Sequence, residues 1–257
     1  MRKEFLLLED IIKDKAKQGP IYYIGNPGNF GDSLIRYGTK KFFHDIGLKY
    51  TELKSFDTSK RYWWPLFFQR NATLIFVGSG AWCDLYSRES LLKSVSKHFK
   101  NIIILPSTYE ITSHIPNATY FTRDKYDSLH YMPDALFCHD MAFYIGTIEA
   151  EQGEGKGYFF RKDNESANII TLPPSNNDIS LQGDENTPIY KFIDAISKFK
   201  IIYTDRLHVS IAACLMGKEV HLYPGSYFKS RAIYLSSMKE YFDNIHFHED
   251  MQFELEQ

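Results

Sequence analysis

The residues best suited to chemistry lie between 204 and 231. A short apolar run at 201–203 predicts a buried strand, and Thr204-Asp205 after it are residue types that favour a helix start. Arg206-Leu207-His208 follow, and apolar residues at helical spacing predict a helix from Leu207. The first turn of a helix offers free N–H groups and positive potential. This stretch therefore predicts a site for an anion beside a group that can exchange a proton.

His208 has two interpretations. A lone histidine is more often structural than catalytic, but this one shares its helix start with Arg206 and precedes Lys229 and Arg231. That setting favours an acid–base role. The other eight histidines show no HExxH or comparable ligand spacing, so the sequence predicts no metal centre.

The glycine loop, residues 25–32 (GNPGNFGD), lies between an expected strand at 21–24 and an expected helix at 32–46. Its glycine spacing is not the GxGxxG dinucleotide pattern, and no GK[ST] of a P-loop follows. Asn26, Asn29 and Asp32 offer polar contacts, and the carboxylate disfavours a phosphate, so a sugar hydroxyl is the better match. The alternative is a tight turn in which Asp32 caps the helix.

Three further features have competing interpretations. Gly78-Ser79-Gly80 follows an expected strand at 73–77, where open α/β sheets bind ligands. Arg123 next to Asp124 is typical of a local ion pair, and Arg161 is typical of an exposed surface arginine. The aromatic stretch 62–68 (YWWPLFF) fits either the core or contact with a lipid-linked substrate.

The elements that must position these residues alternate between strands and helices. Such alternation predicts an α/β fold with parallel sheets in two halves, 1–146 and 147–257, with a linker at 147–157 and a mobile loop at 173–187. The expected elements are helices at 3–17, 32–46, 87–99 and 187–199 and from 207, and strands at 21–24, 50–53, 73–77, 102–105, 119–121, 158–161, 168–171, 201–203 and 219–223.

Composition narrows the class of protein. The chain has 257 residues, 44% of them hydrophobic and 24% charged, and a net charge of −2, which indicates a globular protein without a nucleic-acid footprint. The three scattered cysteines indicate a reducing compartment and no structural zinc. Since no window approaches about 18 apolar residues and the first residues read as an amphipathic helix, we expect a cytoplasmic protein that can touch the inner face of the membrane.

Taken together, these motifs resemble the polysaccharide pyruvyl transferase family. The resemblance covers most of the chain, and its most specific part is the stretch from 204 to 230. The motifs that carry it are GNPGNFGD, VGSG, ILPST, FTRD with Ser128, HDMAF, FFRKDNE and TDRLHVSIAACLMGKEVHLYPGSYFKS.

The resemblance implies two Rossmann-like halves facing a cleft, similar to the GT-B glycosyltransferases, with the acceptor on 1–146 and the pyruvyl donor on 147–257. The donor would be phosphoenolpyruvate, a co-substrate, with no cofactor and no metal. The product would be a pyruvate ketal on a sugar of a surface polysaccharide, such as a capsule or exopolysaccharide, or of its lipid-linked precursor. His208 would be the general acid and Asp32 a base; the other implied site residues are Arg206, Leu207, Lys229, Arg123 and Ser79 for phosphoenolpyruvate, and Asn26, Asn29 and Asp32 for the acceptor.

Two other functions fit parts of the sequence. A GT-B glycosyltransferase with a nucleotide-sugar donor would share the architecture, although Asp205 and Glu219 lie in no recognisable ribose-binding pattern. A non-catalytic carbohydrate-binding or assembly subunit would give the cations between 206 and 231 no compact anion to bind.

Overall fold

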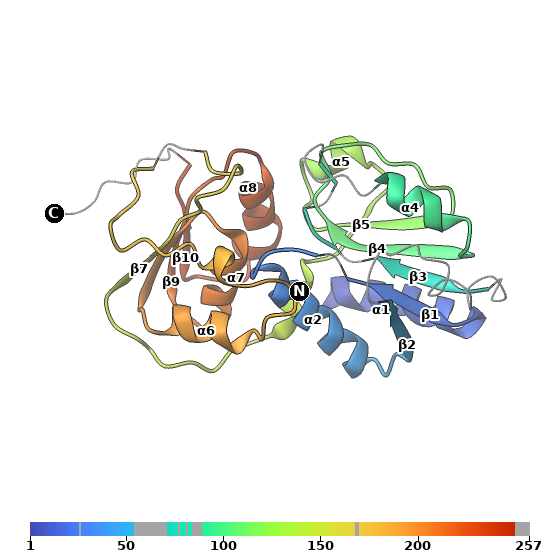
Figure 1. Ribbon diagram of the computed structural model, residues 1–257, viewed down its shortest axis with the longest axis horizontal. Coiled ribbons are helices and arrows are strands. Elements are labelled where there is room, and N and C mark those ends of the chain that lie inside the picture. The colour runs from blue at the N-terminus through green and yellow to red at the C-terminus, as the bar shows by residue number, and fades with distance from the viewer. Residues whose placement is uncertain are drawn as a thin grey trace. The chain divides into compact units, whose positions relative to one another are not determined.

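The computed structural model describes residues 1–25, 27–53, 71–76, 78–80, 82–83, 89–167 and 170–249. These residues form two compact units (Figure 1). The first unit comprises the described residues of Met1–Asn26 and Thr39–Met141, and the second those of Pro27–Gly38 and Ala142–Gln257. Residues 27–38, expected in the N-terminal half, therefore pack within the second unit. The assignment of an acceptor side to 1–146 and a donor side to 147–257 stays a prediction.

The first unit contains a six-stranded parallel sheet in the order β2-β1-β3-β4-β5-β6. Its central strands are near-continuous apolar runs because both faces of the sheet are covered. The strands are β1 (Ile21–Ile24), β2 (Tyr50–Leu53), β3 (Thr73–Phe76), β4 (Asn101–Ser107), β5 (Ala118–Thr122) and β6 (Leu136–Phe137).

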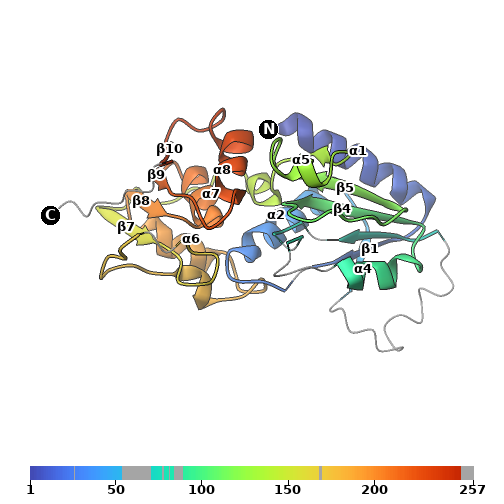
Figure 2. The same ribbon diagram turned by 90° about the horizontal axis from the view of Figure 1, so that it is seen from above.

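Helices cover the two faces of this sheet. Figure 2 shows α1 (Arg2–Gln18) on one face and α4 (Glu89–Ser96) on the other. In α1, Phe5, Leu8 and Ile12 recur at helical spacing and are buried. The remaining helices that contribute to this unit are α5 (Ser128–Tyr131) and the later part of α2 (Asp32–Asp45).

The second unit contains a four-stranded parallel sheet in the order β10-β9-β8-β7. Its strands are β7 (Lys156–Phe159), β8 (Ile201–Thr204), β9 (Glu219–Leu222) and β10 (Ile245–Phe247). Its helices are α6 (Tyr190–Ser197), α7 (Leu207–Leu215), α8 (Lys229–Ile233), a 3₁₀ helix at Met141–Ile145, another at Ile179–Gln182 and a π-helical turn at Tyr234–Met238.

Helix α7 packs against β8 and β9, and it is the most deeply buried helix described in this unit. Eight of its nine residues are buried, and the remaining one is His208. A helix that is apolar nearly all round has to lie in a core. His208 is therefore the one residue of α7 that is partly exposed outside that core.

The predicted fold class is confirmed as α/β with two parallel sheets. The GT-B-like cleft stays a prediction, and the aromatic stretch 62–68 lies outside the described residues. Of the strand expected at 168–171, residues 170–171 are not in a strand and 168–169 lie outside the description. No helix in the described ranges is long and apolar enough to cross a bilayer.

Two segments expected to be loose are bonded into the second unit. In the expected linker 147–157, the N–H of Ile148 donates to Leu215 O at 2.9 Å and that of Glu154 to Lys198 O at 3.0 Å. In the expected mobile loop 173–187, the Asn176 side chain bonds the main chain of Phe160 at both N–H and C=O. Hydrogen bonds therefore hold both polar segments in the second unit.

Candidate functional site

The turn between β8 and α7 is built by Thr204. Its hydroxyl donates to Phe159 O at 2.8 Å and accepts the N–H of Arg206 at 2.9 Å. Helical hydrogen bonding then starts with Ser210 N–H to Arg206 O at 3.1 Å. This arrangement places Arg206 directly before the first turn of α7, with the buried Leu207 as its first residue.

Arg206 is a buried cation held by two carboxylates. Its Nε and Nη2 atoms each lie 2.6 Å from an oxygen of Asp178, a bidentate pair, and Nη2 also lies 2.9 Å from Asp163 Oδ2. Asp178 comes from the segment before the 3₁₀ helix at 179–182, and Asp163 from the segment after β7. The predicted binding residue therefore already has a set of anionic partners.

These contacts belong to a chain of alternating charges, which we call the charge network: Asp178, Arg206, Asp163, Arg161, Glu165 and Lys229. Arg161 forms ion pairs with Asp163, at 2.8 Å, and with Glu165, at 2.7 Å, and Lys229 Nζ lies 2.6 Å from Glu165 Oε2. Three cations thus alternate with three carboxylates around the carboxyl ends of β7 and β8.

The cations determine the protonation of the network. Burial alone would raise the pKa of Glu165, but Lys229 and Arg161 outweigh it and lower that pKa to about 2. The pKa of Asp163 is also lowered, because Arg161 and Arg206 outweigh its burial. Both carboxylates are therefore ionised at neutral pH, and the network has no excess positive charge.

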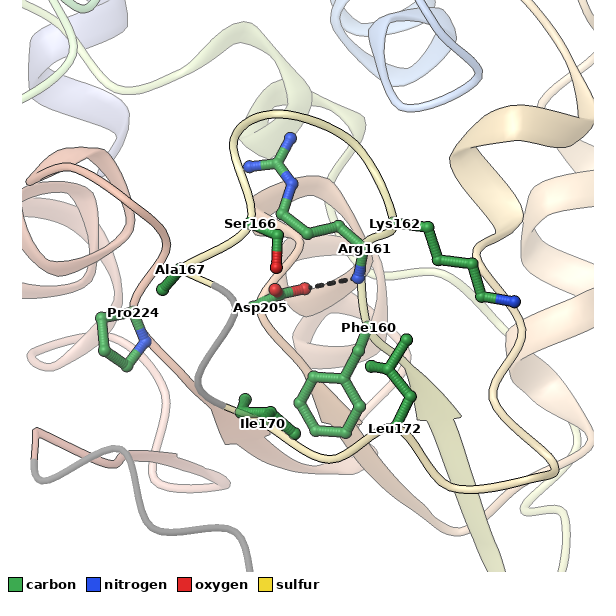
Figure 3. Close-up of a pocket in the computed structure, with 9 residues that line it drawn as sticks. All are labelled: Phe160, Arg161, Lys162, Ser166, Ala167, Ile170, Leu172, Asp205 and Pro224. Atoms are coloured by element: carbon green, nitrogen blue, oxygen red, sulfur yellow. Dashed lines mark hydrogen bonds between the residues drawn. The ribbon is translucent and has the colours of Figure 1, made fainter.

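Asp205 lies beside this network and lines a cavity of about 250 Å³. Figure 3 shows its carboxylate accepting the N–H of Arg161, at 2.8 Å, while the Ser166 hydroxyl points toward it. Burial raises the pKa of Asp205 to about 6, against the opposing effects of that N–H and of Arg161 and Arg206. The cavity lies at the carboxyl edge of the sheet and is lined by Phe160, Arg161, Lys162, Ser166, Ala167, Ile170, Leu172, Asp205 and Pro224.

His208 lies against the glycine loop, within the same unit. A Cβ added at Gly31 would come within 2.9 Å of His208 Nδ1, so the main chain of the loop is packed against the imidazole. Asn29 and Asp32 make contacts inside the loop: Asn29 Oδ1 accepts the N–H of Gly31, and Asp32 Oδ2 accepts the N–H of Asn29. Asn26 lies outside the described residues.

Arg123 and Ser79 lie in the first unit and are buried. Arg123 is paired with Asp140 at 2.6 Å and bonds Thr108 Oγ1 at 2.8 Å; the ion pair expected with Asp124 is not the one formed. Ser79 accepts the N–H of Thr108 through its carbonyl oxygen at 3.1 Å. The roles predicted for both residues in binding the pyruvyl donor stay predictions.

Sequence reasoning missed four residues of the network: Arg161, Asp163, Glu165 and Asp178. Arg161 was expected to be exposed, but it is 6% exposed, because Asp163 and Glu165 satisfy its charge inside the unit. The alternating charges of FFRKDNE were the available signal for this pairing. Asp178, in a polar loop, carries no comparable local signal. Among the described residues, no group of three or more His, Cys, Asp or Glu side chains could hold a metal ion.

The fold and the site define an α/β protein with a histidine and a partly buried charge network at the carboxyl edge of its second sheet. A family model described as polysaccharide pyruvyl transferase matches residues 29–226, and the chain belongs to that family. A search of curated proteins returned no significant match.

A solved structure is similar over nearly the whole chain. It is the crystal structure of an uncharacterized protein from Klebsiella pneumoniae subsp. pneumoniae NTUH-K2044, with a TM-score of 0.78 and 26% sequence identity. The similarity covers 97% of this chain and 100% of the Klebsiella chain.

Proposed function

We propose that this protein transfers the enolpyruvyl group of phosphoenolpyruvate to two hydroxyls of one sugar, forming a pyruvate ketal and releasing phosphate. The sugar would belong to a surface polysaccharide or its lipid-linked precursor. The observation that carries the proposal is the family match, which includes Arg206, Leu207 and His208 at the start of α7.

The pyruvyl donor carries a phosphate and a carboxylate, so its site must supply cations and N–H groups. Arg206 and Lys229 are the proposed cations, and the first turn of α7 adds main-chain N–H groups, which the Arg206 side chain does not cap. Burial strengthens charge-assisted bonds from Arg206 because water competes less there.

Donor binding must compete with the carboxylates of the charge network. Asp163 is the more accessible partner of Arg206, with 31% of its side chain exposed against 3% for Asp178. We infer that an anionic group of the pyruvyl donor replaces Asp163 at Arg206 and Glu165 at Lys229, while Asp178 stays in place and holds the guanidinium.

The proposed chemistry starts with proton transfer from His208 to C3 of the enol, which becomes a methyl group and leaves an electrophilic C2. One sugar hydroxyl adds to C2 and loses its proton, phosphate leaves with the electron pair of the C2–O bond, and the second hydroxyl adds to C2 and loses its proton to close the ketal. One of the two protons restores His208 and the other leaves with the phosphate. Fixed cations can stabilise the departing phosphate, so the proposal includes no metal and no cofactor.

The acceptor side rests on the sequence alone. Asn26, Asn29 and Asp32 are its proposed contacts, with Asp32 as a base, and contact of the protein with the inner membrane face would bring it to a lipid-linked acceptor. The described contacts of Asn29 and Asp32 within their own loop are compatible with the alternative of a structural turn.

Thermal unfolding with millimolar phosphoenolpyruvate, compared with UDP- and GDP-sugars, tests the donor. Binding to the native state raises the melting temperature. A rise with phosphoenolpyruvate alone supports the proposal; a rise with a nucleotide sugar alone supports the glycosyltransferase alternative and overturns it.

The role of His208 is tested by His208→Ala. Loss of a general acid lowers turnover about 10²- to 10⁴-fold, measured as phosphate release with a saccharide acceptor, while stabilisation by phosphoenolpyruvate is retained. If the variant keeps its turnover, His208 has a structural role.

A further inference from the structure

We propose that the glycine loop is a positioning element for His208, with Gly31 as the residue that sets the imidazole ring. The inference rests on the proposed function for its kinetic consequence, but its structural part can be tested separately. It gives the loop a task distinct from binding the acceptor.

The first observation is the absence of space for a side chain at Gly31. An added Cβ would lie 2.9 Å from His208 Nδ1, 3.0 Å from Asn29 Oδ1 and 3.1 Å from His208 Cβ. Gly31 is not among the described glycines with positive φ, so glycine is required here for close approach and not for backbone conformation. Its main chain therefore forms a wall against the ring.

The second observation is that the polar residues of the loop build the turn that presents Gly31. Asn29 Oδ1 accepts the Gly31 N–H at 2.8 Å, and Asp32 Oδ2 accepts the Asn29 N–H at 2.9 Å. A Cβ at Gly28 would lie only 2.1 Å from Asp32 Oδ2, so Gly28 makes room for that carboxylate. In the described contacts, all four residues therefore help to build the same turn: Gly28, Asn29, Gly31 and Asp32.

The third observation is that the loop is anchored to the unit that carries His208. The N–H of Phe30 donates to Ser180 O at 3.2 Å, and the N–H of Gly28 donates to Glu185 Oε2 at 3.0 Å. The Phe30 ring is buried and meets Phe192 of α6 edge to face, with 5.1 Å between ring centroids. The wall against His208 is therefore fixed by contacts from two other segments.

A fixed ring matters because a general acid has to be within hydrogen-bond reach of the atom it protonates. His208 is the half-buried residue of an otherwise buried helix, so its main chain is held by α7 and its ring by the loop. Gly31 is thus a positioning residue, which acts through His208 without contacting the substrate.

The main test is Gly31→Ala, examined by NMR of the His208 ring and by steady-state kinetics. We expect displaced ring resonances and a kcat lowered about 10- to 100-fold, the scale of a displacement of about 1 Å, with the KM for phosphoenolpyruvate within about twofold. In the His208→Ala background the same substitution should have no further effect on the residual rate.

The control is Gly47→Ala. This glycine has a φ of +66° and no neighbour within 4 Å of an added Cβ, so alanine there strains the backbone without touching His208. We expect a small loss of stability, unchanged His208 resonances and unchanged kcat. Equal effects of the two substitutions on the ring and on kcat would overturn the proposal.

A milder pair of variants decides the question if Gly31→Ala does not fold. Asn29→Ala removes the acceptor of the Gly31 N–H and should lower kcat about tenfold and displace the ring resonances, whereas Asn29→Asp keeps an acceptor oxygen and should restore kcat to within about threefold. Unperturbed ring resonances in folded Gly31→Ala, or in Asn29→Ala, overturn the inference. If the unmodified protein shows no pyruvyl transfer, the proposed function fails while the NMR comparison still decides the positioning role.

Discussion

Two buried arginines, one in each unit, follow parallel strands and differ in how exposed their carboxylate partners are. Arg123, after β5, is 1% exposed, and so is its partner Asp140. Arg206, after β8, is also buried, and of its two partners Asp178 is 3% exposed but Asp163 is 31% exposed. The comparison separates a fully buried ion pair from one whose carboxylate a ligand can reach. What matters is whether a ligand can replace the carboxylate that the arginine already holds.

The largest effect should come from breaking the buried ion pair of Arg123 and Asp140. Arg123→Ala leaves Asp140 buried without its cation, and we expect a loss of about 3–5 kcal/mol in the free energy of unfolding. Urea denaturation measures this loss. Stabilisation of the folded variant by phosphoenolpyruvate then tests the donor-binding role predicted for Arg123.

Arg231→Ala is the matched control for that substitution. Arg231 and Glu249 are 52% and 65% exposed and 3.6 Å apart, so their separation should cost less than about 1 kcal/mol. A stable Arg123→Ala protein that no longer responds to phosphoenolpyruvate would make Arg123 a binding residue and remove the contrast between the two arginines.

The second effect concerns Asp205, a buried acid beside the charge network. Its folded-state pKa of about 6 is above the ordinary 3.8, so ionisation opposes folding. The destabilisation is absent below the unfolded pKa, grows as pH rises from about 4 to 6, and reaches at most about 3 kcal/mol above pH 6.

Asp205→Asn removes that titration and keeps an oxygen for the Arg161 N–H. We expect the variant to gain stability over the unmodified protein as pH rises from 4 to 7.5, measured as the difference in unfolding free energy at each pH. A difference that does not change with pH would contradict the raised pKa.

The third effect is on the affinity of Arg206 for the pyruvyl donor. Arg206→Ala should weaken phosphoenolpyruvate binding about 10- to 100-fold, which corresponds to one charged hydrogen bond of about 1.5–3 kcal/mol. Because Asp178 is left buried, the protein is also destabilised, so affinity has to be measured by titration on the folded variant.

Arg206→Lys keeps a charge for Asp178 but loses the bidentate geometry, and it should lie between alanine and the unmodified protein. Unchanged affinity in Arg206→Ala would place the anion elsewhere and assign the two arginines the same structural role.

The smallest effect should come from Asp163, the most exposed carboxylate of the charge network. Asp163→Asn removes a competitor for Arg206 Nη2, so we expect donor affinity to rise about two- to fivefold, in line with about 0.2–1 kcal/mol for an accessible ion pair. Asp243→Asn, at an exposed acid of the same unit, controls for net charge. A weaker affinity in Asp163→Asn would mean that Asp163 positions Arg206 and does not compete for it.

The sequence predicts the fold wherever the pattern is local. The helix expected at 32–46 is α2, Asp32–Asp45, and the strand expected at 201–203 is β8, Ile201–Thr204. The expected strand at 168–171 was misplaced at residues 170–171, while β6 and β10, with two and three residues, were missed. Such short strands are defined by pairing with distant neighbours, which a local pattern does not contain.

The same limit applies to the site. The start of α7 could be predicted because a strand, a turn and an apolar helix follow each other within a few residues. The partners of Arg206 could not, since Asp178 and Asp163 lie 28 and 43 residues away in the sequence. Contact between Gly28 and Glu185 spans 157 residues, so the glycine loop could be read as a ligand loop but not as part of the second unit.

Lys218 binds main-chain carbonyl groups of the segment 148–156, which leads into the second unit. The residue is 2% exposed, and its ammonium donates to the carbonyl oxygens of Glu151, Gln152 and Ser197, with Gln152 at 2.7 Å and Ser197 at 3.0 Å. A stretch rich in glycine and acid would ordinarily be an early point of cleavage for a protease. Here one amine binds the carbonyl groups of Glu151 and Gln152, in addition to the main-chain hydrogen bonds of Ile148 and Glu154. A chemical modification that removes this amine should therefore make the stretch easier to cleave.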